Sequence, residues 1–281
     1  MKGVIVTAGY GTRFLPVTKT VPKEMLPLVT RPSIGFIVDE FIASGITEIL
    51  FITSRRKKAL EDYFDREMEL EAAFRAAGDT AKLAAIEPAR ASCYFVRQPE
   101  MRGTGHALLL ARSFVGSEPF VVAYPDDLHF GEVPLARQLI ATWEKTGCTV
   151  LATLHDPPDL NRYGLISIAA DGLHVTDIIE KPPKGKEPSR EASIGRFLYT
   201  PDFLEELAAQ WARHGSGEFF HTPGVLALAR RGRVVFQRVE GERLDTGEPS
   251  GYLEAILRYA DTVPELRAVI DRIVASRHPA G

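Results

Sequence analysis

The sequence predicts an α/β fold in which a mainly parallel sheet is flanked by helices. Strand-like and helix-like patterns alternate through the first half of the chain, and glycine turns separate them. The strand-like segments are short, continuous apolar runs, which are typical of strands buried on both faces. We therefore expect crossover units, in which a helix connects two parallel strands.

The first half contains the clearest alternation. Apolar runs predict strands at residues 3–6, 48–52, 92–96 and 120–124. Helical spacing predicts helices at 33–43, 56–64 and 106–111, and Gly45 stands just past the first of them as a stop signal. Residues 65–90 are rich in charge and alanine, and we interpret them as an inserted pair of solvated helices rather than a partner-binding element.

The second half is more mixed. It predicts strands at residues 148–154, 164–168, 175–179 and 234–239, and helices at 201–211, 251–259 and 263–276. The last helix is amphipathic. Its apolar positions could cover the domain itself or a neighbouring subunit, and the sequence does not choose between the two.

The composition excludes several classes of protein. With 45% hydrophobic and 25% charged residues over 281 positions, the chain has the make-up of a globular protein with a sizeable core. Its net charge of −3 argues against nucleic-acid binding and against an anionic membrane surface. We expect neither a signal peptide nor a transmembrane span. Cys93 and Cys148 fit neither a disulfide framework nor a zinc spacing, so we expect buried apolar cysteines in a reducing cytoplasm.

The most informative segment is A-G-Y-G-T-R-F-L-P-V-T-K-T-V-P-K-E-M-L-P at residues 8–27, directly after the first strand. Gly9 and Gly11 let the backbone approach a ligand, and successive amides in such a turn form an anion-binding concavity. Arg13 offers a planar fork for phosphate oxygens and Lys23 a mobile point charge. The segment predicts a phosphate site, with a simple turn as the alternative.

Neither of the common phosphate-binding patterns fits this segment. The dinucleotide fingerprint requires Gly or Ala at the sixth position, where this chain has Phe14. The P-loop pattern requires a Gly-Lys-Ser/Thr run, which is absent after Gly9. The sequence therefore indicates a phosphate cradle of another type.

Acidic residues follow a later strand. Asp126 and Asp127 come directly after the apolar run that ends at 124, and ligands in open α/β sheets bind outside the carboxyl ends of the strands. Mg²⁺ is commonly held by one or two carboxylates together with substrate phosphates. Asp126 is therefore a candidate metal ligand, with a turn or cap aspartate as the alternative. Asp245, in the turn L-D-T-G, could complete the metal site or cap the following helix.

Two further turns offer ligand-binding groups. In Q-P-E-M-R-G-T-G-H, the Gln98 amide and the exposed backbone around Gly103 could pair with the edge of a nucleobase. Glu180 and Lys181 follow a strand, and could hold sugar hydroxyls and a phosphate respectively. The alternative for this pair is an exposed strand end. The sequence offers no Ser/His/Asp or Cys/His arrangement, so covalent catalysis lacks a candidate nucleophile.

These segments, in this order, resemble the bacterial UTP–glucose-1-phosphate uridylyltransferases within the sugar-nucleotide pyrophosphorylase family. The resemblance runs from Lys2 to about Tyr259. It rests on the 8–27 segment and on R-Q-P-E-M-R-G-T-G-H-A, Y-P-D-D, R-Y-G-L-I, I-I-E-K-P, I-G-R-F and L-D-T-G-x-x-x-G-Y.

The resemblance implies a single nucleotide-diphospho-sugar transferase domain over residues 1–281, with a Rossmann-like mixed sheet. Residues 1–130 would form mainly the nucleotide side, 131–260 the sugar-phosphate side and 261–281 a terminal helix. It implies UTP and a sugar 1-phosphate as substrates, Mg²⁺ as cofactor, and a homo-oligomer, dimer or tetramer. The implied site residues are Ala8, Gly9, Gly11, Gln98 and Gly103 for the nucleotide, Arg13, Lys23 and Lys181 for catalysis, Tyr163, Gly164, Glu180, Lys181 and Gly195 for the sugar phosphate, and Asp126 and Asp245 for the metal.

One segment departs from the family pattern. Typical members carry an acidic-Ile-Gln-Leu-Thr-Asp segment near the sugar, where this chain has G-E-F-F-H-T-P at residues 217–223. Only Glu218 and Thr222 clearly match. The departure leaves open another sugar 1-phosphate, dTTP or another nucleotide on the same fold, or a non-catalytic regulatory protein that binds nucleotide sugars.

Overall fold

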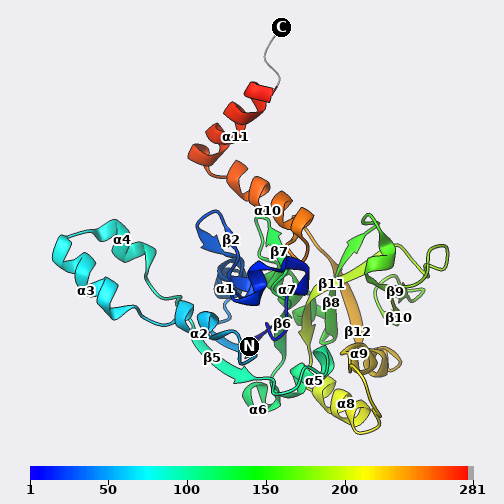
Figure 1. The fold of residues 1–281 in the computed structure, drawn as a ribbon. Helices are drawn as coiled ribbons and strands as arrows, with labels where there is room; N and C mark the ends of the chain where they lie inside the picture. The colour runs from blue at the N-terminus through cyan, green and yellow to red at the C-terminus, as the bar shows by residue number, and fades with distance from the viewer. Residues whose placement is uncertain (278–281) are drawn as a thin grey trace.

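A computed structural model describes residues 1–277 of the chain (Figure 1). Its centre is a nine-stranded sheet in the order β10-β9-β11-β6-β1-β4-β5, with β8 beside β11 and β12 beside β8. In the first half, the parallel strands β6, β1, β4 and β5 lie side by side, as the alternation predicts. Their bounds are β1 Lys2–Val6, β4 Glu48–Thr53, β5 Ser92–Arg97 and β6 Phe120–Ala123.

The second half adds mainly antiparallel strands, so the sheet is mixed. β11 is antiparallel to β6, β8 and β9, and β12 is parallel to β8. The apolar pattern of the sequence did not predict β11, although this nine-residue strand joins the two halves of the sheet. The strands are β8 Thr149–His155, β9 Gly164–Ile168, β10 Val175–Glu180, β11 Glu191–Tyr199 and β12 Val234–Arg238.

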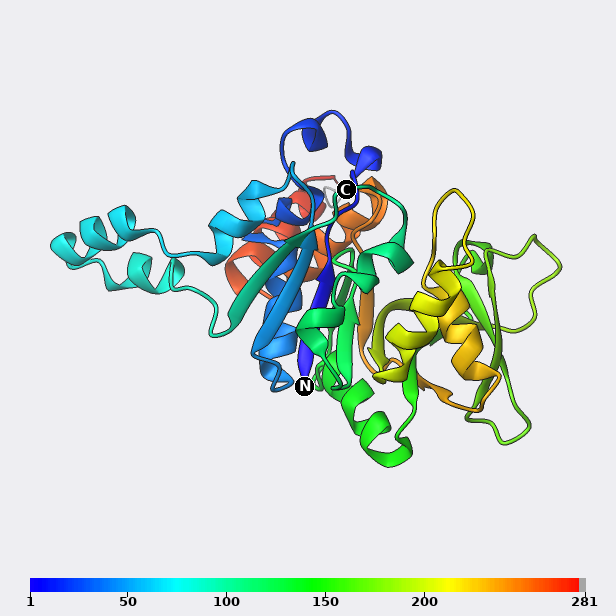
Figure 2. The same cartoon turned by 90° about the horizontal axis from the view of Figure 1, so that it is seen from below.

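Helices cover both faces of this sheet (Figure 2). α1 and α7 pack on one face, and α5, α6, α8 and α9 on the other. α7 and α9 were not among the helices predicted from the sequence. The helices of these two layers are α1 Ser33–Ala43, α5 Thr104–Leu109, α6 Arg112–Val115, α7 Leu135–Thr146, α8 Asp202–Trp211 and α9 Thr222–Ala229.

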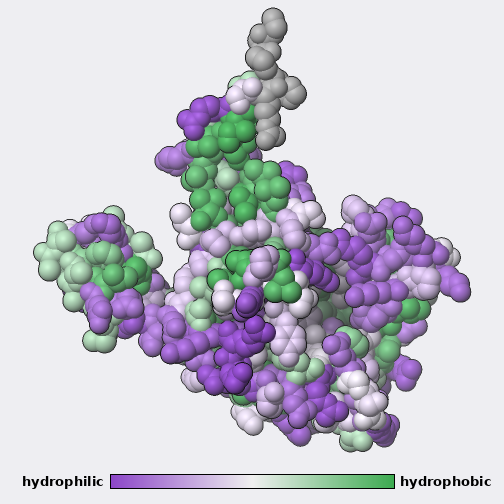
Figure 3. All heavy atoms as spheres, in the orientation of Figure 1, coloured by the Kyte–Doolittle hydropathy of each residue, from purple (hydrophilic) through white to green (hydrophobic). Residues whose placement is uncertain are grey.

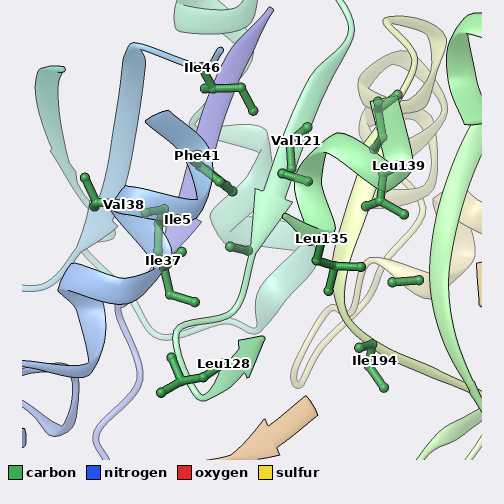
Figure 4. Close-up of a cluster of buried hydrophobic side chains, with 14 of the residues drawn as sticks. Ile5, Ile37, Val38, Phe41, Ile46, Val121, Leu128, Leu135, Leu139 and Ile194 are labelled. Atoms are coloured by element: carbon green, nitrogen blue, oxygen red, sulfur yellow. The ribbon is translucent and has the colours of Figure 1, made fainter. Parts of the chain in front are cut away.

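Alternation along each strand divides the core into two clusters. In β1, Ile5 belongs to the cluster under α1 and α7, and Val4 to the cluster under α5 and α8. Successive strand side chains point to opposite faces, so a continuous apolar run fills both clusters at once. Figure 4 shows the first cluster, in which side chains from α1 and α7 meet those of the sheet.

The remaining elements surround the sheet. The predicted helix at 56–64 begins two residues later, at Lys58. The charged stretch 65–90 forms the expected helix pair, which projects from the body (Figure 1). These elements are β2 Pro27–Leu28, β3 Arg31–Pro32, α2 Lys58–Phe64, α3 Met68–Ala77, α4 Thr80–Ala85, β7 Asp127–Phe130, β13 Glu242–Asp245, α10 Pro249–Asp261 and α11 Pro264–Arg277, with single 3₁₀ turns at Thr12–Phe14, Val17–Lys19, Lys23–Met25 and Leu160–Arg162.

Both cysteines were expected to be buried. Cys148 is buried, but Cys93 is only half-buried because it lies on β5, the edge strand of the sheet.

The terminal helix α11 extends away from the sheet and does not cover it (Figure 1). Within residues 1–277, no helix combines the length and the apolar character that crossing a membrane requires.

Candidate functional site

The predicted nucleotide-side residues lie at the carboxyl ends of neighbouring strands. The backbone amide of Thr7 donates to the Ile52 carbonyl at 2.8 Å, and the backbone amide of Gln98 donates to the Thr53 carbonyl at 2.8 Å. The ends of β1, β4 and β5 therefore form one edge, from which the loops after each strand rise. On that edge Gln98 Nε2 donates to the Gly103 carbonyl at 3.2 Å, which fixes the glycine turn to the end of β5.

The glycine loop after β1 turns back toward Lys23. Gly11 has a φ of +68°, a conformation that favours glycine, and its carbonyl accepts from Thr18 Oγ1 at 2.8 Å. A Cβ at Gly11 would lie 3.1 Å from the Lys23 Cβ, so the loop and the 3₁₀ turn that carries Lys23 are in close contact. The sequence places these residues twelve positions apart, and the loop brings them together.

Lys23 forms an ion pair with Asp126. Its Nζ lies 2.7 Å from Asp126 Oδ2, across 103 positions of sequence. Burial by itself would lower the pKa of Lys23, but the negative charges of Asp126 and Glu24 outweigh it, and the pKa is raised. Burial would likewise raise the pKa of Asp126, but Lys23 outweighs it and that pKa is lowered. Both groups therefore keep their charges at neutral pH.

The two predicted metal ligands approach each other at Gly247. A Cβ built on Gly247 would lie 2.9 Å from Asp245 Oδ1 and 3.2 Å from Asp126 Oδ2, so both carboxylates border the same point. The Thr246 amide donates to the Asp126 carbonyl at 2.8 Å, which ties the two loops together. Arg13 reaches the same turn, donating to the Gly247 carbonyl at 3.4 Å.

A cavity of about 510 Å³ opens beside these carboxylates. It brings together eight of the predicted site residues, which are Arg13, Asp126, Tyr163, Gly164, Glu180, Lys181, Gly195 and Asp245. The other six, Ala8, Gly9, Gly11, Lys23, Gln98 and Gly103, do not line it. The residues predicted for the sugar phosphate thus line a formed cavity, whereas those predicted for the nucleotide lie on an edge of backbone and loops.

Glu180 and Lys181 are fixed by their neighbours. Lys181 has a φ of +45°, and its amide donates to the Tyr163 carbonyl at 2.9 Å. Glu180 Oε1 accepts from Thr222 Oγ1 at 2.7 Å, and the missing side chain of Gly164 leaves room for this carboxylate. Asn161 Nδ2 donates to the Pro182 carbonyl at 2.7 Å and holds the turn that follows.

The prediction of site residues omitted the buried pair Asp127 and Arg243. Arg243 forms an ion pair with Asp127, and its Nη1 lies 3.3 Å from Asp245 Oδ2. The Gly195 amide donates to Asp127 Oδ2 at 2.7 Å. Burial raises the pKa of Asp127 even though Arg243 opposes it, and the two aspartates raise the pKa of Arg243 despite its burial. Asp127 and Arg243 lie 116 positions apart in the sequence, so no local pattern indicates that they pair.

Segment 217–223, which departs from the family pattern, packs against the Gly103 turn. The Phe219 amide donates to the Arg102 carbonyl at 2.8 Å, and the Gly105 amide donates to the Phe219 carbonyl at 2.9 Å. Farther along, His221 lines the cavity and Thr222 holds Glu180. This segment therefore connects the turn predicted for the nucleotide to a residue predicted for the sugar phosphate, which its sequence did not indicate.

Gly103→Ala should destabilise the fold more than a Gly→Ala substitution at a position that has a positive φ but no close neighbour. A Cβ at Gly103 would lie 2.4 Å from the Phe219 carbonyl oxygen, on a residue whose φ is +94°. Gly172, with a φ of +73° and open space around it, is the matched control. We expect about 1 kcal/mol of lost stability for Gly172→Ala and at least 2 kcal/mol for Gly103→Ala in urea unfolding. Equal losses would contradict the close packing of segment 217–223.

The described residues contain no cluster of three or more His, Cys, Asp or Glu side chains that could hold a metal ion on their own. Asp126 and Asp245 are a pair of hard oxygen donors, which is the number that suits Mg²⁺ when substrate phosphates supply further oxygens. The donor set therefore fits a metal brought together with a phosphate ligand.

Comparison with known proteins agrees with this architecture. The sequence profile of the nucleotidyl transferase family matches residues 2–262. A UTP–glucose-1-phosphate uridylyltransferase of Bacillus subtilis is 39% identical over 272 residues, which cover 95% of this chain and 93% of the relative. A uridylyltransferase of Staphylococcus saprophyticus with the same description is 39% identical over 265 residues, covering 92% of this chain and 91% of its own.

Solved structures agree as well. A UTP-bound UGPase from Acinetobacter baumannii has a TM-score of 0.87 and 31% identity, with 97% of this chain and 98% of that one covered. A UDP-glucose pyrophosphorylase complexed with UDP-glucose has a TM-score of 0.79 and 34% identity, covering 93% of this chain and 98% of its own. The fold, the order of the site segments and these similarities lead to one conclusion: the chain belongs to the nucleotidyl transferase family.

Proposed function

We propose that this protein transfers a uridylyl group from UTP to a sugar 1-phosphate, with glucose 1-phosphate as the principal acceptor, and releases pyrophosphate. The observation that carries the proposal is the cavity in which carboxylates and cations converge. Asp126, Asp245 and Lys181 line this cavity, and Arg13 and Lys23 stand beside the carboxylates. The names of the similar uridylyltransferases, and the UTP and UDP-glucose bound by the similar structures, support the choice of substrates.

The proposed reaction needs no general base. A phosphate oxygen of the sugar 1-phosphate attacks the α-phosphorus of UTP in line, a new P–O bond forms, and the bond to the β-phosphate breaks. Pyrophosphate leaves with the electron pair of that bond. A phosphate monoester has its second pKa near 6, so the attacking oxygen is already an anion at neutral pH. Catalysis then depends on positioning two anions and neutralising charge, which agrees with a site built from cations.

The cations would divide this task by position. Arg13, beside the Gly247 turn, and Lys23, paired with Asp126, lie where the triphosphate would approach the edge of the sheet. Lys181, held by the Tyr163 carbonyl, lies on the sugar-phosphate side. Mg²⁺, which Asp126 and Asp245 would hold, supplies charge neutralisation on the triphosphate when it is bound. Ala8, Gly9, Gly11, Gln98 and Gly103 would contact the uridine and phosphates, and Tyr163, Gly164, Glu180 and Gly195 the sugar phosphate.

An assay of pyrophosphate release tests this proposal. The purified protein is mixed with Mg²⁺ and a matrix of triphosphates (UTP, dTTP, ATP and GTP) against glucose 1-phosphate and other sugar 1-phosphates. We expect the highest kcat/KM for UTP with glucose 1-phosphate. A higher kcat/KM for dTTP or for another sugar 1-phosphate would instead identify that compound as the substrate. Binding of UDP-glucose without turnover of any pair would favour a regulatory protein.

The cytoplasm is the compartment that we propose for this reaction. Cys93 and Cys148 are both free thiols, as expected in a reducing compartment. Burial raises the pKa of the Cys93 thiol to about 11, which keeps it protonated and unreactive at neutral pH.

A homo-oligomer is also part of the proposal. The helix α11 projects from the body, and an apolar face continues over α10 and α11 (Figure 3). Its exposed members are Leu253, Leu257, Val269, Ile273 and Val274. Monomers rarely leave such a face uncovered, and a second copy of the chain could cover it with the same face.

Substitutions on this face should break the oligomer. We expect the unchanged protein to have the mass of two or four 31.0 kDa chains in light scattering after gel filtration. The double variant Ile273→Glu, Val274→Glu should move toward one chain, because each charge would have to be buried at the interface. Arg272→Gln, at an exposed position of the same helix, is the control. A monomeric unchanged protein would refute this part of the proposal.

A further inference from the structure

His221 lies in the wall of the cavity, where parts of the two substrate sides meet. Its Nδ1 is 3.2 Å from Thr104 Oγ1, next to the Gly103 turn, and 3.0 Å from Tyr124 Oη, just past the end of β6. The ring of Phe197, on β11, lies 5.0 Å from the imidazole between ring centres. The side chain is 9% exposed. Three separate parts of the fold thus fix the imidazole in one orientation.

The imidazole is neutral, and its free nitrogen can donate. Burial lowers the pKa of His221 to about 4, although the nearby Glu180 charge opposes the shift, so a single N–H is present near pH 7. Tyr124 is a phenol, which carries its proton at neutral pH and can donate it. We assign the Tyr124 proton to the bond with Nδ1, which places the imidazole proton on Nε2. Within residues 1–277, His221 Nε2 has no hydrogen-bond partner. It is also not one of the fully buried polar atoms that lack a partner, so it stays accessible.

A carboxylate with a free oxygen lines the same cavity. The residue after His221 is Thr222, whose hydroxyl occupies Glu180 Oε1. Glu180 Oε2 accepts no hydrogen bond from the described chain, and both Glu180 and His221 line the cavity. One N–H donor and one carboxylate acceptor are together what a hydroxyl requires, because a hydroxyl accepts one hydrogen bond and donates another. A phosphate, which carries negative charge, would be repelled by the carboxylate.

We propose that His221 determines specificity for the sugar: its Nε2–H donates to a hydroxyl of the sugar 1-phosphate, and that hydroxyl donates to Glu180. This inference rests on the proposed function, and it names a contact within it.

The test compares His221→Leu with the unchanged protein on glucose 1-phosphate and on its 2-, 3-, 4- and 6-deoxy analogues, with UTP constant. We expect kcat/KM for glucose 1-phosphate to fall about tenfold or more, since a hydroxyl loses its donor in a buried site. The KM for UTP should stay unchanged. For one deoxy analogue, the one that lacks the contacted hydroxyl, unchanged protein and variant should have similar kcat/KM values. His221→Gln, which keeps an N–H donor, should restore part of the activity.

Controls separate this contact from effects on folding. Phe220→Leu changes a side chain that is 49% exposed on the same segment and does not line the cavity, and it should leave every sugar unaffected. Equal losses with all analogues, or an unchanged kcat/KM in His221→Leu, would overturn the role of His221 while leaving uridylyl transfer intact. If the unchanged protein turns over no sugar 1-phosphate at all, both this inference and the proposed function are wrong.

Discussion

Lys23→Ala should lower kcat by about a hundredfold or more, the usual cost of removing one group that stabilises charge in a transition state. Its Nζ is 2.7 Å from Asp126, on the side of the site that we assign to the triphosphate. The substitution removes a positive charge where negative charge shifts from the α-phosphorus to the leaving pyrophosphate. The KM for glucose 1-phosphate should change less than kcat, because the proposed sugar-phosphate contacts lie elsewhere. Steady-state kinetics with both substrates varied provides the measurement.

The Lys23 variant should keep its fold. Alanine retains the Cβ that packs against Gly11, and the backbone bond from the Leu26 amide to the Lys23 carbonyl does not depend on the side chain. Lys19→Ala removes an exposed lysine from the same loop and should retain normal turnover. If a folded Lys23→Ala protein matched Lys19→Ala in kcat, the catalytic role assigned to Lys23 would be wrong.

Asp126→Asn should have an effect of similar size, with a different signature. The amide keeps the shape of the side chain but removes the charge, so Mg²⁺ would lose one of its two proposed carboxylates. We expect kcat to fall by about a hundredfold or more. The Mg²⁺ concentration for half-maximal activity should also rise, which does not follow from the loss of a purely structural aspartate. Titration of activity with Mg²⁺ measures both quantities.

The Asp126 substitution also leaves the local backbone intact. Thr246 donates to the Asp126 carbonyl, and that bond is independent of the side chain. Asp177→Asn, at an exposed position of β10, is the matched control and should not alter the Mg²⁺ dependence. An Asp126→Asn protein with normal Mg²⁺ dependence would remove Asp126 from the metal site.

The first half of the fold follows from local sequence. Residues such as Val4 and Ile5 form apolar runs buried on both faces, and the Ser33–Ala43 helix has apolar residues at helical spacing. Parallel strands need crossover connections, so the alternation itself fixes how neighbouring strands run. The predicted strands therefore lie within a residue or two of those observed.

The central strand β11 escaped prediction because its polar residues are satisfied only in three dimensions. Arg196 is fully buried, and its guanidinium pairs with Glu40 at 2.8–2.9 Å. Glu191 is buried and pairs with His155 and Arg238. In sequence these charges interrupt an apolar run, which argues against a buried strand. Their partners lie 36 to 156 positions away, beyond the reach of any local pattern.

The site shows the same division. The order of turns after strands predicted a phosphate site, a carboxylate and a sugar side, since the carboxyl ends of parallel strands share an edge. The prediction of site residues did not include Asp127 with Arg243, or the imidazole of His221. Each of these depends on burial and on a partner from another element, and neither is visible in one sequence segment.

By itself, the sequence determined the α/β architecture of the first half, the family, and eight of the residues that line the cavity. Those properties depend on periodicity, on glycine and on the order of short segments, all of which are local. The tertiary structure alone decided that Lys23 pairs with Asp126, that Asp126 and Asp245 meet at Gly247, and that segment 217–223 joins the two sides of the site. Charge pairing and packing act through space, so residues a hundred positions apart acquire their roles only when the chain is folded.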